Sequence, residues 1–337
     1  MADPRYDEAI FPTDLLLALA MIAPERGVQA ENLCRGLGFS VEDLSKPSTR
    51  LSYRQASLMV QRALVAIPDP SLGLTIGARG TLGSMGLIGH AMAMSRTLGE
   101  AMGLGLQHLV LTGALGYRID LHEAGTQIWL ELEHQFPDPD IQAFITEEAF
   151  SSTLTYGRAL TGGAMTVTRV EFAHSERGIG NFAREIFAAP VSFGCAHNRF
   201  VIEAQHMMLP VPTHHPLGLH QALELLETFA QQEKAKDDLC SAVERAAYKT
   251  LMQGITLEDV ARELNMSGRT LRRRLSAGGM SFEALVENVR KTRALSLLTH
   301  SGVAVERIAI ETGYSDVRNF RRAFKRWTGV SPSEYRH

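Results

Sequence analysis

The residues of this chain best suited to binding chemistry are arginines grouped in two segments near its carboxyl end. Residues 267–275 read SGRTLRRRL, and residues 317–327 read VRNFRRAFKRW. Arginine carries a permanent charge on a planar fork of donors that fits phosphate groups and the major-groove edge of guanine. Both segments therefore predict contact with a nucleic acid.

Each of these segments also carries apolar residues at helical spacing. Leu271 and Leu275 lie four apart, and a second apolar stripe is formed by Val317, Phe320, Phe324 and Trp327. We interpret both stripes as core, so the aromatic rings are not base-stacking groups. The polar positions around them are the predicted DNA-binding residues: Ser267, Arg269, Thr270, Arg272, Arg273, Arg318, Asn319, Arg321, Arg322 and Lys325.

A short helix and a tight turn precede each arginine-bearing helix. Thr256 is a suitable N-cap for a first helix over 257–264, Asn265 suits the turn, and Ser267 caps the next helix. Gly313 fits the turn of the second pair. We therefore predict two helix-turn-helix units, at about 256–276 and 304–327, joined by one long helix over 281–298.

Charge is distributed unevenly along the 337 residues. Residues 236–337 hold 18 Lys and Arg and 12 Asp and Glu, a net of +6, whereas residues 1–235 hold 16 and 25, a net of −9. A basic end favours nucleic-acid binding, because neutralising phosphates releases counterions. A solvated basic surface is the alternative that charge alone leaves open. The length predicts two or three domains.

The first 232 residues predict a mixed α+β domain. Its predicted elements are helices over 14–22, 52–67, 71–79, 87–95, 98–111, 138–160 and 175–187, a hairpin of strands 114–121 and 126–133 around the turn HEAG, strands 166–174, 191–193 and 199–203, and a helix over 217–231. The polar run QQEKAKDD (231–238) marks the domain junction, which we place at 232/233, and we expect it to lie inside a helix or between helices. A helix over 239–252 follows it. The predicted fold is thus an α+β domain followed by an all-α domain with two helix-turn-helix units.

The segment GYSDVRNFRRAFKRWTGVSPSEYR closely resembles the signature of the AraC/XylS-type transcription regulators, and TLEDVARELNMSGRTLRRRL resembles the first unit of the same family. The resemblance implies a seven-helix domain that places its two units in successive major grooves of double-stranded promoter DNA. It also implies contact with RNA polymerase. Because activation is the commoner role in that family, it implies an activator.

The first domain resembles the ligand-sensing domain of one branch of that family, which includes ornithine/arginine-type and fatty-acid-responsive regulators. The segments SLGLTIGARGTLGSMGLIGHAMAMSRTLGEAM and FGCAHNRFVIEA carry this resemblance. It implies a small amino-acid-like or fatty-acid-like effector and a homodimer. By proximity in sequence, the candidate effector-binding residues are Arg79, His90, Met94 and Arg96.

The glycines and methionines of this stretch have two interpretations each. The glycines over 83–113 permit close helix packing or line a pocket. Methionine side chains suit either an adaptable pocket or ordinary filling of the core, and the second is favoured; those concerned are Met85, Met92, Met94 and Met102.

Other classes of site find little support in the sequence. His214, His215 and His220, or Cys195 with His197, fit no closed tetrahedral metal site, and neither G-x-S-x-G, H-E-x-x-H nor a phosphate-binding loop occurs. We therefore expect no metal, no cofactor and no enzyme activity. The apolar run LLLALAMIA (15–23) is too short to span a membrane, so we expect a cytoplasmic protein. Two alternatives stay open: control by a protein partner instead of a small ligand, and an enzyme tethered to DNA.

Overall fold

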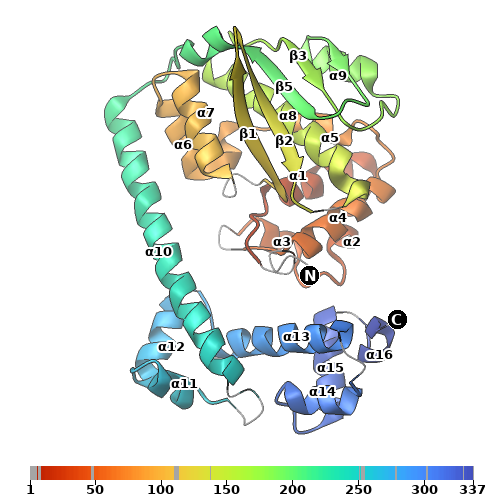
Figure 1. Ribbon diagram of the computed structural model, residues 1–337, viewed down its shortest axis with the longest axis vertical. Helices are drawn as coiled ribbons and strands as arrows, with labels where there is room; N and C mark the ends of the chain where they lie inside the picture. The colour runs from red at the N-terminus through yellow and green to blue at the C-terminus, as the bar shows by residue number, and fades with distance from the viewer. Residues whose placement is uncertain are drawn as a thin grey trace. The chain divides into compact units, whose positions relative to one another are not determined.

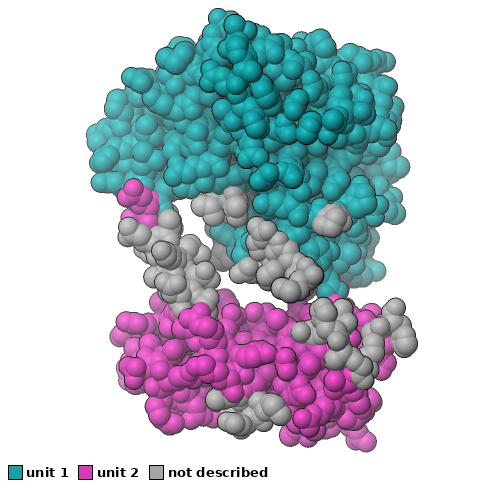
Figure 2. Space-filling model, in the orientation of Figure 1, with its two compact units in different colours: residues 1–35, 39–226 teal, residues 36–38, 227–337 magenta. Residues whose placement is uncertain are grey.

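The computed structural model describes residue 6 and residues 9–46, 49–109, 114–136, 138–249, 251, 255–277, 279–300, 303–328 and 330–336. The chain divides into two compact units (Figures 1 and 2). Unit 1 comprises residues 1–35 and 39–226, and unit 2 comprises residues 36–38 and 227–337.

One helix, α10 (Pro216–Lys249), runs across the boundary between the units. The sequence placed the polar run 231–238 either inside a helix or between two helices, and the structure has it inside α10. The run contains neither glycine nor proline, and Gln, Glu, Lys and Ala are all good helix formers, so nothing in it interrupts the helix. The predicted end of the second helix, at residue 252, lies outside the described residues.

Unit 1 is a mixed α/β domain. Its α-helices are α1 (Asp14–Ile22), α2 (Ala30–Cys34), α3 (Val41–Leu44), α4 (Tyr53–Ala66), α5 (Leu72–Ala78), α6 (Gly86–Met94), α7 (Leu98–Gln107), α8 (Pro139–Leu160) and α9 (Gly180–Phe187). Single-turn 3-10 helices occur at Pro24–Arg26, Leu82–Met85 and Ala204–Met208. The short helices α2 and α3 were not predicted. Helix α9 begins later than predicted because Arg177 and Gly178 have φ angles of 51° and 82°, which no α-helix contains.

Helix starts in unit 1 depend on side-chain caps. Ser52 forms a capping box with Gln55 at the start of α4, as its position predicted. The side chain of Thr13 makes no cap at α1; its hydroxyl donates to the Leu44 carbonyl oxygen at 2.7 Å instead. Helix α7 ends at Gln107, earlier than the predicted end at residue 111, which itself lies outside the described residues.

A five-stranded sheet forms the other part of unit 1, with strand order β1-β2-β5-β3-β4. The strands are β1 (Tyr117–Ala124), β2 (Gln127–His134), β3 (Arg169–Glu171), β4 (Val191–Ser192) and β5 (Asn198–Glu203). Neighbours are antiparallel except β3 and β4. The predicted hairpin is present, but Ala124 pairs with Gln127, so the turn is Gly125–Thr126 and not HEAG. Glycine suits this two-residue turn because φ is 61° there.

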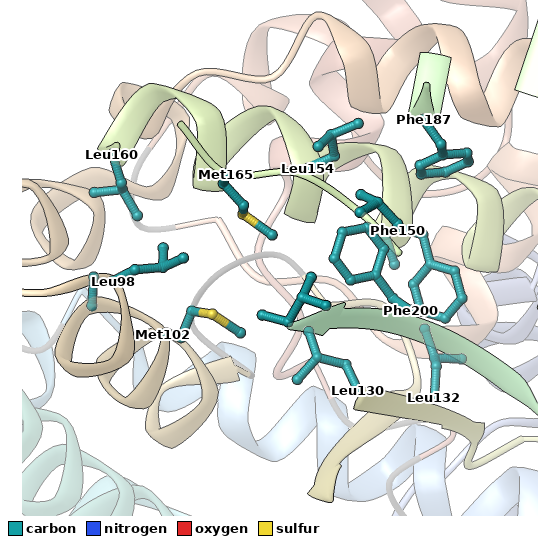
Figure 3. Close-up of a cluster of buried hydrophobic side chains, with 14 of the residues drawn as sticks. Leu98, Met102, Leu130, Leu132, Phe150, Leu154, Leu160, Met165, Phe187 and Phe200 are labelled. Atoms are coloured by element: carbon teal, nitrogen blue, oxygen red, sulfur yellow. The ribbon is translucent and has the colours of Figure 1, made fainter. Parts of the chain in front are cut away.

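The core of unit 1 lies on one face of the sheet. The predicted apolar face of β2, with Ile128, Leu130 and Leu132, is buried in it (Figure 3). Phe150 of α8 and Phe200 of β5 belong to the same cluster. Strand β2 carries charged groups on its other face, where Arg199 Nε lies 2.8 Å from Glu131 Oε2. This alternation is the pattern of a sheet covered on one side.

Unit 2 is helical in its described residues. After α10 come α11 (Leu257–Glu263), α12 (Gly268–Ala277), α13 (Phe282–His300), α14 (Val305–Glu311), α15 (Val317–Thr328) and α16 (Pro332–Arg336). Two separate apolar clusters hold them together. Helix α13 contributes Leu285 to the first cluster and Leu298 to the second. The long joining helix predicted from the sequence is therefore present and belongs to both cores.

Candidate functional site

The first candidate surface is the outer side of helix α12. Thr256 caps α11, where its Oγ1 accepts from the Asp259 amide at 3.2 Å, and Asn265 makes the turn with φ of 54°. Ser267 caps α12 by accepting from the Thr270 amide at 3.2 Å. Leu271 and Leu275 are buried. Helical geometry then directs the neighbouring arginines outward, and four of them are exposed: Arg269, Arg272, Arg273 and Arg274.

Helix α15 repeats this arrangement. Gly313 makes the turn with φ of 76°, and Asp316 Oδ1 accepts from the Arg318 amide at 2.8 Å at the start of the helix. The buried pair Phe320 and Phe324 lies 49 residues after Leu271 and Leu275. Polar residues at the matching outward positions are also exposed: Arg318, Asn319, Arg321 and Arg322, together with Lys325 one turn later.

Contacts with α13 fix the position of the second helix pair. Glu287 on α13 accepts from Trp327 Nε1 at 2.7 Å and pairs with Arg326. The indole hydrogen bond is the main reason that the pKa of Glu287 is lowered. Arg290 lies 4.9 Å above the ring of Tyr314, which follows the turn between α14 and α15. The second arginine-bearing helix is thus anchored to the connecting helix α13.

Most of the predicted DNA-binding arginines are unpaired. In the described part of the chain, no ion pair engages the following guanidinium groups: Arg269, Arg272, Arg273, Arg318 and Arg322. Arg321 differs, because its Nη2 lies 3.1 Å from Glu306 Oε1 on α14. Ser267 and Thr270 also have local partners, since their hydroxyl oxygens lie 2.8 Å apart within the cap. These arginines can donate hydrogen bonds to phosphate groups or base edges without first losing a partner.

The second candidate site is a cavity of about 510 Å³ inside unit 1. Helices α1, α5, α6, α7 and α8 and the strands β1 and β2 all contribute to its wall. Figure 3 shows apolar side chains from α7, α8 and β2 that line it, among them Leu98, Met102, Leu130 and Leu160. Volume and lining both fall within the range of small-molecule sites, which are mostly apolar with a few polar groups.

Helix α8 contributes a group of polar residues to the lining of the cavity: Glu148, Ser152, Thr153 and Tyr156. Glu148 Oε1 accepts from Ser152 Oγ at 2.6 Å. Burial raises the pKa of Glu148 to about 7, an effect that the Ser152 hydrogen bond reduces in part. The pKa of Tyr156, also in the lining, is raised chiefly by burial and secondarily by the charge of Glu148. At α1, burial likewise raises the pKa of Asp14.

The four predicted effector residues do not come together. Arg79 lines the cavity, where its Nη1 lies 2.7 Å from Glu25 Oε2. His90, Met94 and Arg96 lie outside the described lining. Arg96 is exposed and pairs with Glu100 at 3.1 Å. Core filling was the favoured interpretation of the methionines, and Met85, Met92 and Met102 are buried in the core and also line the cavity.

Glycine also has both predicted roles in this region. A Cβ on Gly89 would lie 1.9 Å from the Leu82 carbonyl oxygen, so that glycine permits close packing. Gly105 lines the cavity.

Sequence reasoning missed Glu148, although a pattern was available. Ile141, Phe144, Ile145 and Ala149 are buried on α8, and Glu148 falls at the same helical spacing. A carboxyl group on the apolar stripe of a long helix is costly to bury, so it indicates a binding site in which the carboxyl group contacts a ligand.

The histidines considered as metal ligands have local hydrogen bonds. His214 Nδ1 lies 2.9 Å from the Met94 carbonyl oxygen, and His215 Nδ1 accepts from the Gly218 amide at 2.9 Å. Among the residues described, no group of three or more His, Cys, Asp or Glu side chains could hold a metal ion. A search of the same residues finds no helix with the length and hydropathy needed to cross a membrane.

Comparison with known proteins agrees with this geometry. Residues 27–211 match the family model of the arabinose-binding N-terminal domain of AraC transcription regulators, and residues 260–337 match a helix-turn-helix domain model. An uncharacterized HTH-type transcriptional regulator of Mycobacterium tuberculosis is 28% identical over 337 residues, which cover 98% of each chain. The ornithine utilization regulator of Pseudomonas aeruginosa is 28% identical over 332 residues, again 98% of each chain. The regulator VqsM of the same organism is 44% identical over 82 residues, 24% of this chain and 25% of its own. The chain therefore belongs to the AraC family of DNA-binding transcription regulators, with an arabinose-binding-like N-terminal domain and a C-terminal helix-turn-helix domain.

Proposed function

We propose that this protein is a transcription activator whose binding to promoter DNA is controlled by a small molecule in the cavity of unit 1. The observation that carries the proposal is the repeated pair in unit 2: two helices, each on its own apolar core, each with unpaired arginines on its outer side. Helices of this kind enter the major groove, where their early residues contact base edges.

The positions of the arginines on α12 and α15 suggest which of them contact base edges and which contact phosphates. Arg269 and Arg318 lie at the starts of α12 and α15 and Arg273 and Arg322 one turn later, so these four are suited to base edges. Arg321 is held by Glu306 and is suited to a phosphate at the side of the groove. Ser267, Thr270, Asn319 and Lys325 complete the proposed interface. Arg272, at the position that matches Arg321 but unpaired, belongs to either class.

The oligomeric state, the protein partner, the location in the cell and the effector are also part of the proposal. The family resemblance supports a homodimer that contacts RNA polymerase in the cytoplasm. The name of one relative, the ornithine utilization regulator, connects that protein with an amino acid. For this chain an amino-acid-like and a fatty-acid-like effector are the two precedents, and Arg79, the one predicted effector residue in the lining, is the proposed contact at the cavity wall.

Binding of short DNA duplexes by alanine variants tests the DNA-binding assignment. The operator is first obtained by selection from random-sequence DNA with the unaltered full chain. Arg272→Ala and Arg322→Ala should each weaken operator binding by about 1–3 kcal/mol if the residue makes a bidentate base contact. If it contacts only phosphates, the loss should be equal on all sequences and smaller at high salt.

Matched controls are available on the first helix of each pair. Arg262 on α11 and Arg307 on α14 are exposed but paired with Asp259 and Glu311. Arg262→Ala and Arg307→Ala should leave the affinity close to that of the unaltered chain. Wild-type affinity of both Arg272→Ala and Arg322→Ala would remove these residues from the interface.

A further inference from the structure

The side chains that line the cavity in unit 1 restrict the chemical class of ligand that it can bind. Apolar side chains dominate the wall, and five of them are methionines: Met21, Met85, Met92, Met102 and Met165. Thioether side chains are flexible and polarisable, so they adapt to an apolar body of variable shape. A free amino acid is too polar for such a wall, because its groups would lose their hydration without replacement.

One carboxyl group in this wall has no basic partner among the residues that the structure describes. Glu148 sits on α8, and the surface that it retains faces the cavity. Ser152 Oγ donates a hydrogen bond to Glu148 Oε1 at 2.6 Å, which leaves most of the acceptor capacity of the carboxyl group for a ligand. Tyr117 and Tyr156 stand near it in the same lining, and the charge of Glu148 adds to the effect of burial in raising the pKa of both.

The other charged groups of the described lining favour a cation over an anion. Three lining residues are acidic, Asp14, Glu25 and Glu148, and one is basic, Arg79. Arg79 is paired with Glu25, so an entering carboxylate would have to replace that partner. Asp14 lies within electrostatic range of Tyr156, and the charge of Arg50 partly offsets the effect of burial on Asp14. An ammonium group, by contrast, would meet two carboxyl groups that the described lining does not neutralise.

We propose that the cavity binds a hydrophobic amine: a molecule with an apolar body and one ammonium group, which lies against Glu148 beside Tyr156. The apolar body occupies the space between the methionines of α6 and α7 and strand β2. This inference rests on the proposed role of unit 1 as the effector domain, and it selects a ligand class that differs from both family precedents. The attraction between a buried carboxylate and a ligand cation offsets the cost of desolvating both when further hydrogen bonds satisfy the pair, and Ser152 already donates one to Glu148.

Three probes of equal chain length test the ligand class: octylamine, octanol and octanoate, titrated calorimetrically into the full chain. Octylamine should bind most tightly and octanoate most weakly. In Glu148→Gln the affinity for octylamine should fall by at least about tenfold, the loss expected for a hydrogen bond to a charged group. The affinity for octanol should change little, because the apolar wall is unaltered.

Glu147→Gln is the matched control. Glu147 precedes Glu148 on α8 and is buried, but it lies outside the described lining and pairs with Arg177. Octylamine should bind this variant as it binds the unaltered chain. Because the comparison of the three probes uses the unaltered chain, the inference stays testable even where a variant does not fold.

Three results would overturn the inference: octanoate binding as tightly as octylamine, unchanged octylamine affinity in Glu148→Gln, or no binding of any probe. A gel shift of the selected operator, run on the same samples, separates this inference from the proposed function. An amine that binds without altering operator affinity supports the ligand class and refutes effector control. Operator binding that responds to a different class of small molecule supports effector control and refutes the hydrophobic amine as the ligand class.

Discussion

Replacing Gly77 with alanine tests how closely α5 and α8 pack beside the cavity. A Cβ on Gly77 would lie 2.4 Å from the Glu148 carbonyl oxygen, 2.6 Å from Ser151 Cβ and 2.7 Å from the Ser152 amide nitrogen. None of these atoms is the end of a flexible side chain, so the two helices must separate. Overpacking of this kind costs about 1–3 kcal/mol. Alanine offsets up to about 1 kcal/mol of this cost through its higher helix propensity.

Gly103→Ala on α7 is the control, because a Cβ there would meet nothing within 4 Å. That change should stabilise unit 1 by up to about 1 kcal/mol, since only helix propensity is altered. Urea unfolding of the full chain, followed by tryptophan fluorescence, reports both units, because Trp129 lies in unit 1 and Trp327 in unit 2. Gly77→Ala should lower the midpoint of the unit 1 transition and leave that of unit 2 unchanged. Equal stability of the two variants would refute the close packing of α5 on α8.

Two further predictions concern stability. Glu147 and Glu148 both have a pKa raised to about 7 by burial, so folding favours their protonated forms; the resulting stability is present below pH 4.5 and is lost as the pH rises through 7. The free energy of unfolding of unit 1, measured with urea, should therefore be lower at pH 8 than at pH 5 by up to about 3 kcal/mol for each of the two groups. Glu148→Gln should abolish the part of this difference that Glu148 contributes. A free energy of unfolding that does not change with pH would contradict the prediction. In unit 2, Phe320→Ala deletes a fully buried ring and should cost about 3–5 kcal/mol. Thermal unfolding followed by calorimetry measures this loss of stability. Ile310→Ala, at a 49% exposed position, should lower the free energy of unfolding much less, and equal losses for the two variants would contradict the placing of Phe320 in the core.

Local patterns in the sequence predicted much of unit 2. Leu271 and Leu275, with Phe320 and Phe324, recur at helical spacing, and that spacing alone separates the buried side of each helix from the side that carries arginine. Caps such as Thr256 and Ser267 placed helix starts within a residue or two, because a side-chain oxygen that satisfies a free amide is a local feature.

Local sequence patterns could not predict the cavity of unit 1. Its wall combines Asp14, Tyr117 and Glu148, which are separated by more than a hundred residues at the extremes and meet only through tertiary packing. Proximity in sequence chose His90 and Met94, which lie four apart on one side of α6, whereas Met85 and Met92, seven apart, face the cavity. Likewise, Gly73 and Gly77 are spaced for a close helix crossing, but only the partner helix α8 reveals what they approach.

Hydroxyl-radical footprinting of the selected operator tests the central claim that both arginine-bearing helices contact DNA in successive major grooves. The unaltered chain should protect two segments for each copy bound, one helical turn or about 10 base pairs apart. Arg272→Ala should weaken protection of one segment, and Arg322→Ala should weaken protection of the other. A single protected segment, or the same segment weakened by both variants, would contradict the account.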